Sequence, residues 1–251
     1  MDALIRKLEH FSQFTDEERR ALGTLSDLPV MVGPRQDIIR EGDNPTGVNL
    51  IVEGYAIRYK ALPDGRRQIL GYFVAGDICD LRVFVLKRMD HSIAALTQVA
   101  VRVISEQRIL DMTDRYPRIM RALWWATLVE ESISREWLLS MGQRTAAERI
   151  AHIFCEIHHR ARAVGLVEGN SVPLPLRQTD LAEMSGLSVV HVNRVLQELR
   201  KRRLITFDGQ MLTILDIDQL ATFALFDPLY LHLDESRGTI TKRQPISAVG
   251  A

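Results

Sequence analysis

The side chains with the most distinctive chemistry lie within residues 178–203, which read QTDLAEMSGLSVVHVNRVLQELRKRR. Ser188 is an expected helix N-cap, because its hydroxyl can accept a hydrogen bond from the backbone N–H of Val190 or His191. In the helix that follows, apolar residues recur at i, i+3, i+4 and i+7: Val192, Val195, Leu196 and Leu199. The opposite face carries asparagine, arginine and glutamine, whose polar groups can form hydrogen bonds with base edges in a DNA major groove.

A shorter helix precedes this one, and together they have the pattern of a helix-turn-helix. Gly186 can adopt the positive φ that a sharp turn between the helices requires. An ordinary amphipathic helix pair, whose polar face meets only water, has the same pattern. Two later features favour DNA binding: residues 200–203 are four consecutive basic residues, and Asp208-Gly209 predicts the turn of a β-hairpin. A helix-turn-helix followed by a hairpin is a winged helix.

Arg194 is the residue that we expect to contact a base, because its guanidinium can donate two hydrogen bonds to O6 and N7 of guanine. Val190 can make only an apolar contact, for example with a thymine methyl group. The residues expected to contact the DNA backbone are Arg177, Gln178, Thr179 and Lys201. The predicted DNA-contacting surface is completed by Ser188, Val189, His191 and Asn193.

Length and composition restrict what the rest of the chain can be. The 251 residues could form one large or two modest domains, and 46% hydrophobic with 25% charged residues is ordinary for a globular protein. The 32 basic residues are balanced by 32 acidic ones, so attraction to phosphate must come from local placement. No apolar run reaches the roughly 18 residues of a membrane span, and the charged N-terminus lacks the apolar core of a secretory signal. We therefore expect a cytoplasmic protein without membrane contact.

The N-terminal half is predicted to be mostly β-structure. Residues 1–28 favour short helices, with a helix start near Thr15. Short apolar segments separated by turn residues follow: 30–32, 37–40, 48–52, 55–60, 68–74, 93–99 and 101–105. Strands of this length and spacing indicate a compact antiparallel barrel or sandwich.

Residues 115–142 predict one long helix between the halves, because they contain one proline near the start and no glycine until the end. About 24 residues of helix extend roughly 36 Å, more than a small β-domain can cover. We expect a second copy of the helix to cover the remainder in a parallel homodimer, although packing on its own barrel accounts for some of the apolar residues. Trp124 and Trp125 should face different directions, one toward the β-domain and one toward the second copy. Gly142 is the expected hinge.

Two segments, IIREGDNPTGVNLIVEGYAIRYK and FVAGDICDL, resemble the β-roll of the cyclic-nucleotide-binding domain. With the winged helix behind them, most of the chain resembles a Crp/Fnr-family transcription regulator. The resemblance implies an α+β fold with an N-terminal antiparallel, jelly-roll-like β-roll, a long dimerisation helix and a C-terminal winged helix-turn-helix domain. In that family an arginine at the position of Arg194 reads guanine, whereas many relatives carry a glutamate where this chain has Val190.

The resemblance also implies domain boundaries. We expect the sensor roll at 1–112, the dimerisation helix and hinge at 113–142, the DNA-binding domain at 143–230 and a disordered tail at 231–251.

An effector pocket is implied as well. In members that bind cyclic nucleotides, a Gly-Glu pair holds the ribose and an Arg-Ser or Arg-Thr pair holds the cyclic phosphate. Here the corresponding pairs are Gly76-Asp77 and His91-Ser92, so the arginine is missing. Loss of that charge-assisted contact would cost on the order of 1.5–3 kcal/mol, which disfavours a cyclic nucleotide as cofactor. Two neighbouring residues could supply the cation instead: Arg82 and Arg88.

Other sensing chemistries have less support. An iron–sulfur cluster needs about four cysteine ligands, and the cysteines here are Cys79 and Cys155. Haem could be given Cys79 and His91 as ligands, but Cys79 is more simply a core residue. Nothing around either cysteine indicates a lowered pKa for redox chemistry. Three further histidines lack suitably spaced carboxylates or cysteines for a metal site, and we expect them to be solvated: His152, His158 and His159.

The sequence therefore predicts a homodimeric transcription regulator that binds double-stranded DNA at a near-palindromic site, with RNA polymerase as a further expected partner. Its β-roll would sense an effector that is unknown or absent. The alternative is an effector-binding module that acts on a partner protein without contacting DNA, and the basic run and the hairpin count against it. No nucleophile–base pair, metal cluster or phosphate loop indicates an enzyme.

Overall fold

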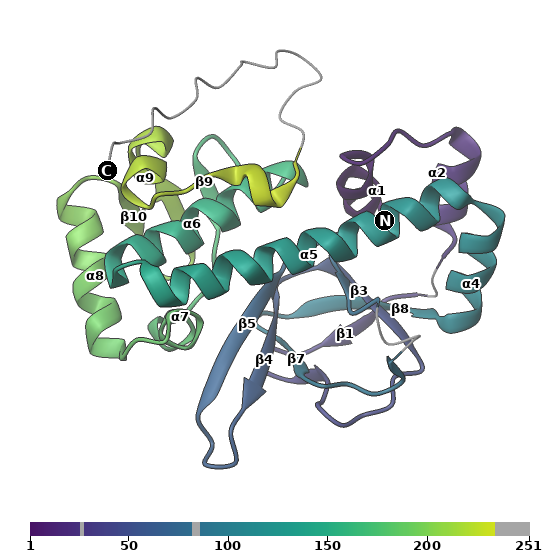
Figure 1. The fold of residues 1–251 in the computed structure, drawn as a ribbon, viewed down its shortest axis with the longest axis horizontal. Coiled ribbons are helices and arrows are strands. Elements are labelled where there is room, and N and C mark those ends of the chain that lie inside the picture. Colours follow the sequence, from purple (N-terminus) through teal and green to yellow (C-terminus); the bar gives the residue numbers. More distant parts are fainter. Residues whose placement is uncertain (26–27, 82–85, 234–251) are drawn as a thin grey trace, which may run out of the picture.

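The computed structural model describes residues 1–25, 28–81 and 86–233. A long helix, α5 (Pro117–Gln143), runs across the molecule, with the β-strands packed along part of it and the C-terminal helices gathered at its end (Figure 1). The α+β architecture expected from the sequence is confirmed. None of the described helices combines the length and the apolar composition that crossing a membrane requires.

The N-terminal half is a roll of two antiparallel sheets of four strands each. The order in one sheet is β1 (Val30–Val32), β8 (Val99–Ser105), β3 (Gly47–Glu53) and β6 (Ile78–Cys79). The order in the other is β2 (Asp37–Ile39), β7 (Ser92–Ala95), β4 (Ala56–Ala61) and β5 (Arg67–Phe73). Side chains from both sheets meet in a buried core, as the predicted barrel or sandwich requires.

The strand predicted over residues 93–99 is wrong, because the chain turns in the middle of it. The backbone N–H groups of Leu96 and Thr97 both donate to the carbonyl oxygen of Tyr55, at 2.8 and 3.4 Å. The Thr97 hydroxyl in turn accepts from the N–H of Tyr55 at 3.0 Å. These bonds end β7 at Ala95 and let β8 begin at Val99 in the other sheet. An apolar run does not reveal such a turn, since its side chains are buried on both sides of it.

Short helices border the described part of the roll: α1 (Asp2–Glu9), α2 (Asp16–Gly23) and α4 (Glu106–Arg115). Thr15 begins α2 as predicted, with its hydroxyl accepting from the N–H of Glu18 and the Glu18 carboxylate accepting from the N–H of Thr15. Helix α4 was not predicted. Ser105, at the end of β8, caps it by accepting from the N–H of Arg108 at 3.4 Å.

Helix α5 begins at Pro117, as the sequence predicts, and is 27 residues long. One side packs on the roll and on α1: Ile119, Ala122, Leu123 and Ala126. Another side exposes apolar side chains along the length of the helix: Met120, Trp124, Leu128, Leu138 and Leu139. Trp124 is 60% exposed, whereas Trp125 packs against the roll cluster and Phe11. The two tryptophans therefore face different directions, as expected.

The C-terminal half has the fold of a winged helix-turn-helix. Its helices are α6 (Ala146–Ala163), α7 (Gln178–Ser185), α8 (Val189–Lys201) and α9 (Ile217–Phe223). Its strands, in sheet order, are β10 (Ile205–Phe207), β11 (Met211–Ile214) and β9 (Ser171–Pro173). The predicted helix pair and hairpin are confirmed, and β9 adds a strand that pairs with β11.

The two halves share one apolar core, which the sequence did not indicate. Roll residues and DNA-binding-half residues contribute to it together, among them Ile57, Ile69, Tyr72, Phe154 and Leu181. Two ion pairs border this contact. Arg35 Nη1 lies 2.5 Å from Asp180 Oδ1, and Arg67 Nε lies 2.7 Å from Glu183 Oε2. Helix α7 is therefore attached to the roll by charge as well as by apolar packing.

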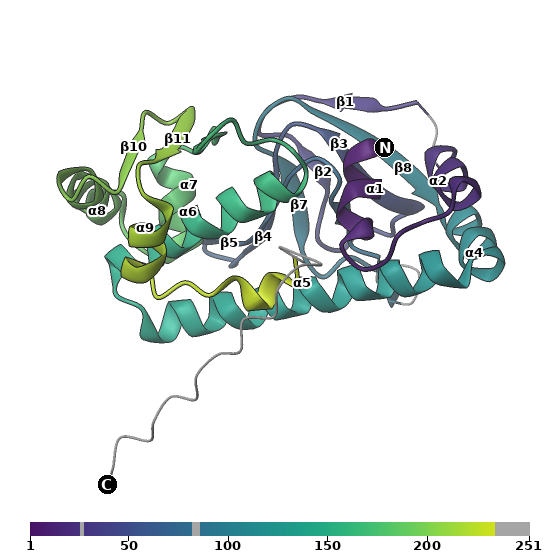
Figure 2. The ribbon, with the colours of Figure 1, turned by 90° about the horizontal axis from the view of Figure 1, so that it is seen from above.

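The chain beyond the wing returns to α5. A 3-10 helix, η1 (Pro228–Leu231), lies along α5 in both overall views (Figures 1 and 2). Leu231 is 1% exposed and packs against Val129 and Ile133 of α5. Packed structure thus continues into the first residues of the expected disordered tail, 231–251. Residues 234–251 lie outside the described part of the chain.

Candidate nucleic-acid interface and effector pocket

The turn between α7 and α8 depends on Gly186. Its φ is 66°, and its N–H donates to the carbonyl oxygen of Ala182 as the C-cap of α7. A Cβ at this position would lie 2.6 Å from the Met141 methyl carbon at the end of α5. Glycine is therefore favoured by the left-handed backbone, whereas the Met141 methyl group is the end of a flexible side chain that could move aside.

Helix α8 presents the predicted recognition face to solvent. The Ser188 hydroxyl accepts from the N–H of His191 at 3.2 Å, which confirms the predicted N-cap. Its inward stripe is at most 3% exposed: Val192, Val195, Leu196 and Leu199. Seven of the predicted DNA-contacting residues are exposed on and beside the helix: Ser188, Val189, Val190, His191, Asn193, Arg194 and Lys201.

Arg194 lies near the middle of this face. It forms no hydrogen bond or ion pair with the described residues, so its donors are available to a base. The neighbouring Asn193 donates to Gln178 Oε1 at 3.4 Å, which ties the recognition helix to the start of α7. Arg177 and Thr179 are exposed at that same end, and Gln178 is half-buried. The structure thus brings the predicted base-contacting and backbone-contacting residues onto one surface.

The basic run at 200–203 contributes less to that surface than the sequence suggests. Arg200 donates to the carbonyl oxygen of Phe207 and holds the wing against α8. Arg202 pairs with Glu198 at 2.9 Å and lies over an aromatic ring of α9. Lys201 remains exposed. A shallow groove along this part of the helix is lined by Asn193, Arg194, Gln197, Glu198, Lys201 and Arg202.

A second candidate site is a cavity of about 260 Å³ between α1, α5 and the roll. Its apolar lining includes Leu4, Leu8, Ile78, Leu81 and Ala126. Its charged lining includes Lys7, Arg58, Asp80, Glu130 and Glu131. Gly76 also lines it, with a φ of 92° and the backbone of Ala3 so close that a Cβ would lie 2.7 Å away. Gly76 of the predicted pair therefore lines this cavity, whereas the buried Asp77 does not.

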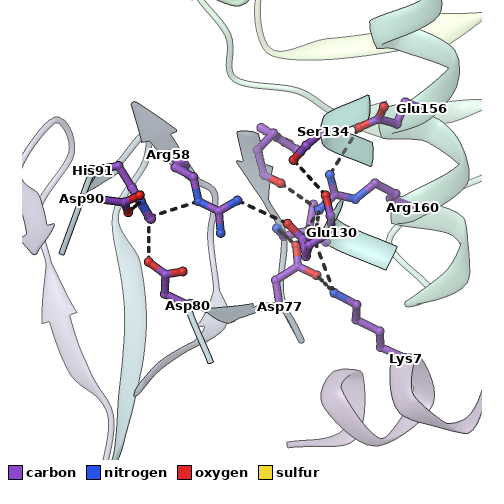
Figure 3. A network of polar contacts seen from close by, with 12 residues as sticks. Lys7, Arg58, Asp77, Asp80, Asp90, His91, Glu130, Ser134, Glu156 and Arg160 are labelled. Atoms are coloured by element: carbon purple, nitrogen blue, oxygen red, sulfur yellow. Dashed lines mark hydrogen bonds and ion pairs between the residues drawn. The ribbon is translucent and has the colours of Figure 1, made fainter. Parts of the chain in front are cut away.

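The carboxylate of Asp77 forms ion pairs with two cationic side chains of the same chain (Figure 3). Its Oδ1 accepts from Lys7 Nζ at 2.6 Å, and its Oδ2 accepts from Arg160 Nη2 at 3.0 Å and from the N–H of Val74 at 2.8 Å. Burial raises the pKa of the Asp77 carboxyl, but the positive charges of Lys7 and Arg160 together lower it by more. The pKa of Asp77 therefore lies below its ordinary value. Asp77 is thus ionised and hydrogen-bonded without a small molecule.

Arg160 reaches this carboxylate from α6 in the DNA-binding half. Its Nη2 also donates to the carbonyl oxygen of Tyr72 at 2.8 Å, and Glu130 and Glu156 lie 3.9 and 3.4 Å away. Burial lowers the pKa of the Arg160 guanidinium, but the surrounding carboxylates raise it by more. One buried guanidinium therefore joins the roll, α5 and the DNA-binding half.

His91 and Ser92 belong to the framework of the roll and are not among the residues that line the cavity. The two ring nitrogens of His91 face carboxylates, with Nε2 2.7 Å from Asp80 and Nδ1 2.6 Å from Asp90. The Ser92 hydroxyl accepts from the N–H of Glu41 at 2.9 Å. Of the two expected pairs, only Gly76 therefore lines the cavity, although His91 contacts the lining residues Arg58 and Asp80.

Arg58 is the cation at this cavity that sequence reasoning missed. Its Nη1 lies 3.6 Å from Glu130 Oε2, and its Nε donates to His91 Nε2 at 3.2 Å. A charged residue within an otherwise apolar strand segment was the available signal. Arg88 is exposed and donates to the carbonyl oxygen of Gly42 at 3.0 Å, away from the cavity. Arg82 lies outside the described residues.

Asp80, Asp90 and His91 offer donor atoms within 4.8 Å of one another, a spacing compatible with a metal ion. Their carboxylates lie at opposite nitrogens of one imidazole, so an ion bound to one ring nitrogen would not contact both carboxylates as they are placed. The cysteines are buried, and burial raises the pKa of Cys155 to about 12 and holds that of Cys79 well above its ordinary value. Both thiols therefore have the core role expected for Cys79.

His152 and His158 are buried, which corrects the expectation of solvated histidines. They are 1% and 2% exposed, and the segment after α9 covers His152. Tyr230 stacks on His152 with ring centroids 5.8 Å apart, and Phe226 contacts its edge at 5.1 Å. Burial lowers the pKa of His152 to about 3 and that of His158 to about 4, so both are neutral at pH 7.

Together, a sensor-like β-roll, a long connecting helix and an exposed recognition helix define a transcription regulator that binds DNA. Residues 29–116 match the family described as the cyclic nucleotide-binding domain, and residues 148–223 match the Crp-like helix-turn-helix domain. The chain belongs to the Crp/Fnr family of transcription regulators.

Relatives of known role agree with this membership. The transcriptional activator protein FnrL of Cereibacter sphaeroides is 28% identical over 178 residues, which cover 70% of this chain and 71% of that protein. A protein of Rhizobium leguminosarum bv. viciae named "Probable transcriptional activator" is 30% identical over 185 residues, which cover 73% and 76%. The solved structure of FixK2 from Bradyrhizobium japonicum shares the fold, with a TM-score of 0.70, 24% identity and coverage of 78% of this chain and 96% of that one. These relatives favour a DNA-binding regulator over a module that acts only through a partner protein.

Proposed function

We propose that this protein binds double-stranded DNA as a homodimer at a near-palindromic site in the cytoplasm and controls transcription there with RNA polymerase as its partner. The observation that carries the proposal is the outward face of α8. On this face Arg194 is exposed, has no hydrogen-bond or ion-pair partner among the described residues, and is framed by polar side chains from α7 and α8. Such a face suits insertion into a major groove. The role is recognition, and no catalytic step is assigned to it.

Helix α5 supports the homodimer. Five of its apolar side chains are 44–75% exposed within the single chain: Met120, Trp124, Leu128, Leu138 and Leu139. Glu131 and Arg135, which pair with each other at 2.8 Å, interrupt this stripe. A parallel second copy of α5 would cover both parts of the stripe about a two-fold axis. It would also supply the second recognition helix that a site with two half-sites about 34–36 Å apart requires.

The buried charges around Asp77 support a roll that needs no cyclic nucleotide. Lys7 and Arg160 already neutralise the carboxylate that would hold a ribose. Neither His91 nor Ser92 is among the residues that line the cavity. We therefore expect cyclic AMP to leave the DNA affinity unchanged.

The test is selection of bound sequences from random double-stranded DNA, with and without cyclic AMP, combined with light scattering for the mass of the complex. We expect enrichment of a near-palindrome with a guanine in each half-site, bound by two chains, and the same result in both conditions. Failure to enrich any sequence, or binding by a single chain to a single half-site, would contradict the proposal. Enrichment only with cyclic AMP would leave the regulator in place and refute the nucleotide-independent roll.

A further inference from the structure

Two valines stand at the N-terminal end of the recognition helix on a face that is otherwise polar. Val190 is 65% exposed and Val189 is 41% exposed. Neither belongs to an apolar cluster of the described residues or packs against one. The first turn of a recognition helix is the part that approaches base edges most closely. The chain therefore offers apolar surface at a place where hydrogen-bonding groups would be the ordinary choice.

Each of these valines lies four residues before a polar residue that is expected to contact DNA. Val190 and Arg194 are four residues apart, so they lie on one strip of the helix about 6 Å apart along its axis. Val189 and Asn193 have the same relation on the adjacent strip. Base pairs in B-DNA are about 3.4 Å apart, so a base opposite Val190 lies about two steps from the base opposite Arg194.

Only one apolar group faces the major groove from the four bases, and it is the C5 methyl of thymine. A valine can contact that methyl, but it cannot donate to guanine or accept from cytosine, whose polar groups would lose water without gaining a partner. We infer that Val190, assisted by Val189, selects thymine about two base pairs from the guanine read by Arg194. This inference rests on the proposed function, because it concerns which DNA sequence the same surface binds.

The test uses the selected DNA site and changes one methyl group at a time. Replacing the thymine in question by deoxyuridine removes only the C5 methyl, and we expect about three- to fourfold weaker binding, the equivalent of one buried carbon. Replacing it by cytosine should weaken binding further, and 5-methylcytosine at that position should recover part of the loss because it restores the methyl. Deoxyuridine placed outside both half-sites is the matched control and should have no effect.

Variants of the protein assign the effect to the valine. Val190→Ala should discriminate less between the thymine and deoxyuridine sites than the wild type does, while it keeps its preference for the guanine. Val190→Glu should change the preference at that position toward cytosine, because a carboxylate accepts from the cytosine amino group. Since Val190 is largely exposed, both variants should keep the wild-type melting temperature, which is measured alongside.

Two results would overturn the inference. One is a wild-type protein that binds thymine and deoxyuridine equally at every position of the half-site. The other is a Val190→Ala variant that remains as sensitive to deoxyuridine as the wild type. In both cases a retained preference for the guanine-containing site leaves the proposed function standing, whereas loss of all sequence preference in the wild type overturns both.

Discussion

Arg194 and Lys201 lie two helical turns apart on the exposed face of α8, yet they should contribute to DNA binding in different ways. A guanidinium that reads guanine distinguishes sequences, whereas an ammonium next to the backbone attracts all DNA. We predict that Arg194→Ala loses about 1–3 kcal/mol of discrimination between bases and retains weak binding to random DNA.

Lys201→Ala should weaken binding to every DNA sequence and reduce the slope of log affinity against log salt concentration by about one unit. Gel shifts across a salt series measure both, and an equal loss on specific and random DNA for Arg194→Ala would contradict the assignment.

Asp77 is the residue on which the buried charge network depends. In Asp77→Asn, Lys7 and Arg160 keep their charges but lose the carboxylate between them, 2.6 and 3.0 Å away. Removing one partner of a buried ion pair typically costs about 3–5 kcal/mol, so we predict a decrease of that size in the free energy of unfolding. Urea denaturation measures it. Asp64→Asn, which removes an exposed carboxylate paired with Arg66, is the matched control and should leave stability unchanged.

His152 should make the stability of the protein depend on pH. Burial lowers its pKa to about 3, and the positive charge of the nearby Arg144 lowers it as well. The unfolded chain binds a proton below about pH 6.5 and the folded chain does not, so His152 destabilises the fold as the pH falls from 6.5 toward 3.

At pH 5 the contribution of His152 should be about 2 kcal/mol. Unfolding of the wild type and of His152→Asn at pH 7 and pH 5 tests this. The difference in stability between the two pH values should be smaller in the variant by that amount. An unchanged difference would show that His152 is not the responsible group. The exposed His191→Gln is the control and should behave as the wild type does.

Among the elements, α5 has two apolar sides. Its inner side packs against the roll and α1, so substitutions there would disturb the fold itself. Its outer side can be changed without that complication. Leu138 is 75% exposed in the single chain, and Leu128 is 46% exposed.

We predict that Leu128→Asp combined with Leu138→Asp converts the protein to a monomer with an unchanged helix content, because it places like charges on both sides of the dimer contact. Light scattering measures the mass, and circular dichroism measures the helix content. Leu62→Asp, at a 53% exposed leucine after β4, is the control and should remain a dimer. A double variant that stays dimeric would place the contact elsewhere.

At the scale of the whole molecule, the C-terminal segment after α9 controls the link between the two halves. The hinge is expected at Gly142, in the last turn of α5. Arg144, the first residue after α5, is bonded to residues on both sides of the expected hinge. Its guanidinium donates to the carbonyl oxygens of Ala224 and Leu225 at 3.1 and 3.0 Å and pairs with Glu136 at 2.7 Å. Further along, Tyr230 donates to Glu156 at 2.8 Å. The segment therefore holds the hinge in one arrangement.

A chain that ends after Leu225 should have a lower melting temperature and faster tryptic cleavage near Arg144 than a chain that ends after Leu233. The shorter chain loses the aromatic cover of His152 and the contact of Leu231 with α5, so the hinge can open more often. Calorimetry and timed proteolysis measure the two effects. Equal cleavage rates in the two chains would show that the segment does not restrain the hinge.

The amino-acid sequence by itself determined the parts of this protein that depend on local patterns. Apolar spacing placed α8, and the positions of proline and glycine placed α5. A serine and a threonine located helix starts, and Gly186 located the turn between α7 and α8. These features involve residues within a few positions of one another, and backbone geometry follows from their types. The recognition face could be predicted in the same way, because the outward side of a helix is known once its inward side is.

Only the tertiary structure decided which distant residues meet. Arg160 and Asp77 are 83 positions apart, and no pattern within either segment indicates that the guanidinium of α6 neutralises a carboxylate of the roll. The same holds for Arg58 at the cavity and for the burial of His152 and His158. A polar residue has the same local preferences whether it is solvated or buried with a partner. Burial and pairing are settled by the packing of whole elements, so the recognition helix could be predicted in advance and the charge network behind it could not.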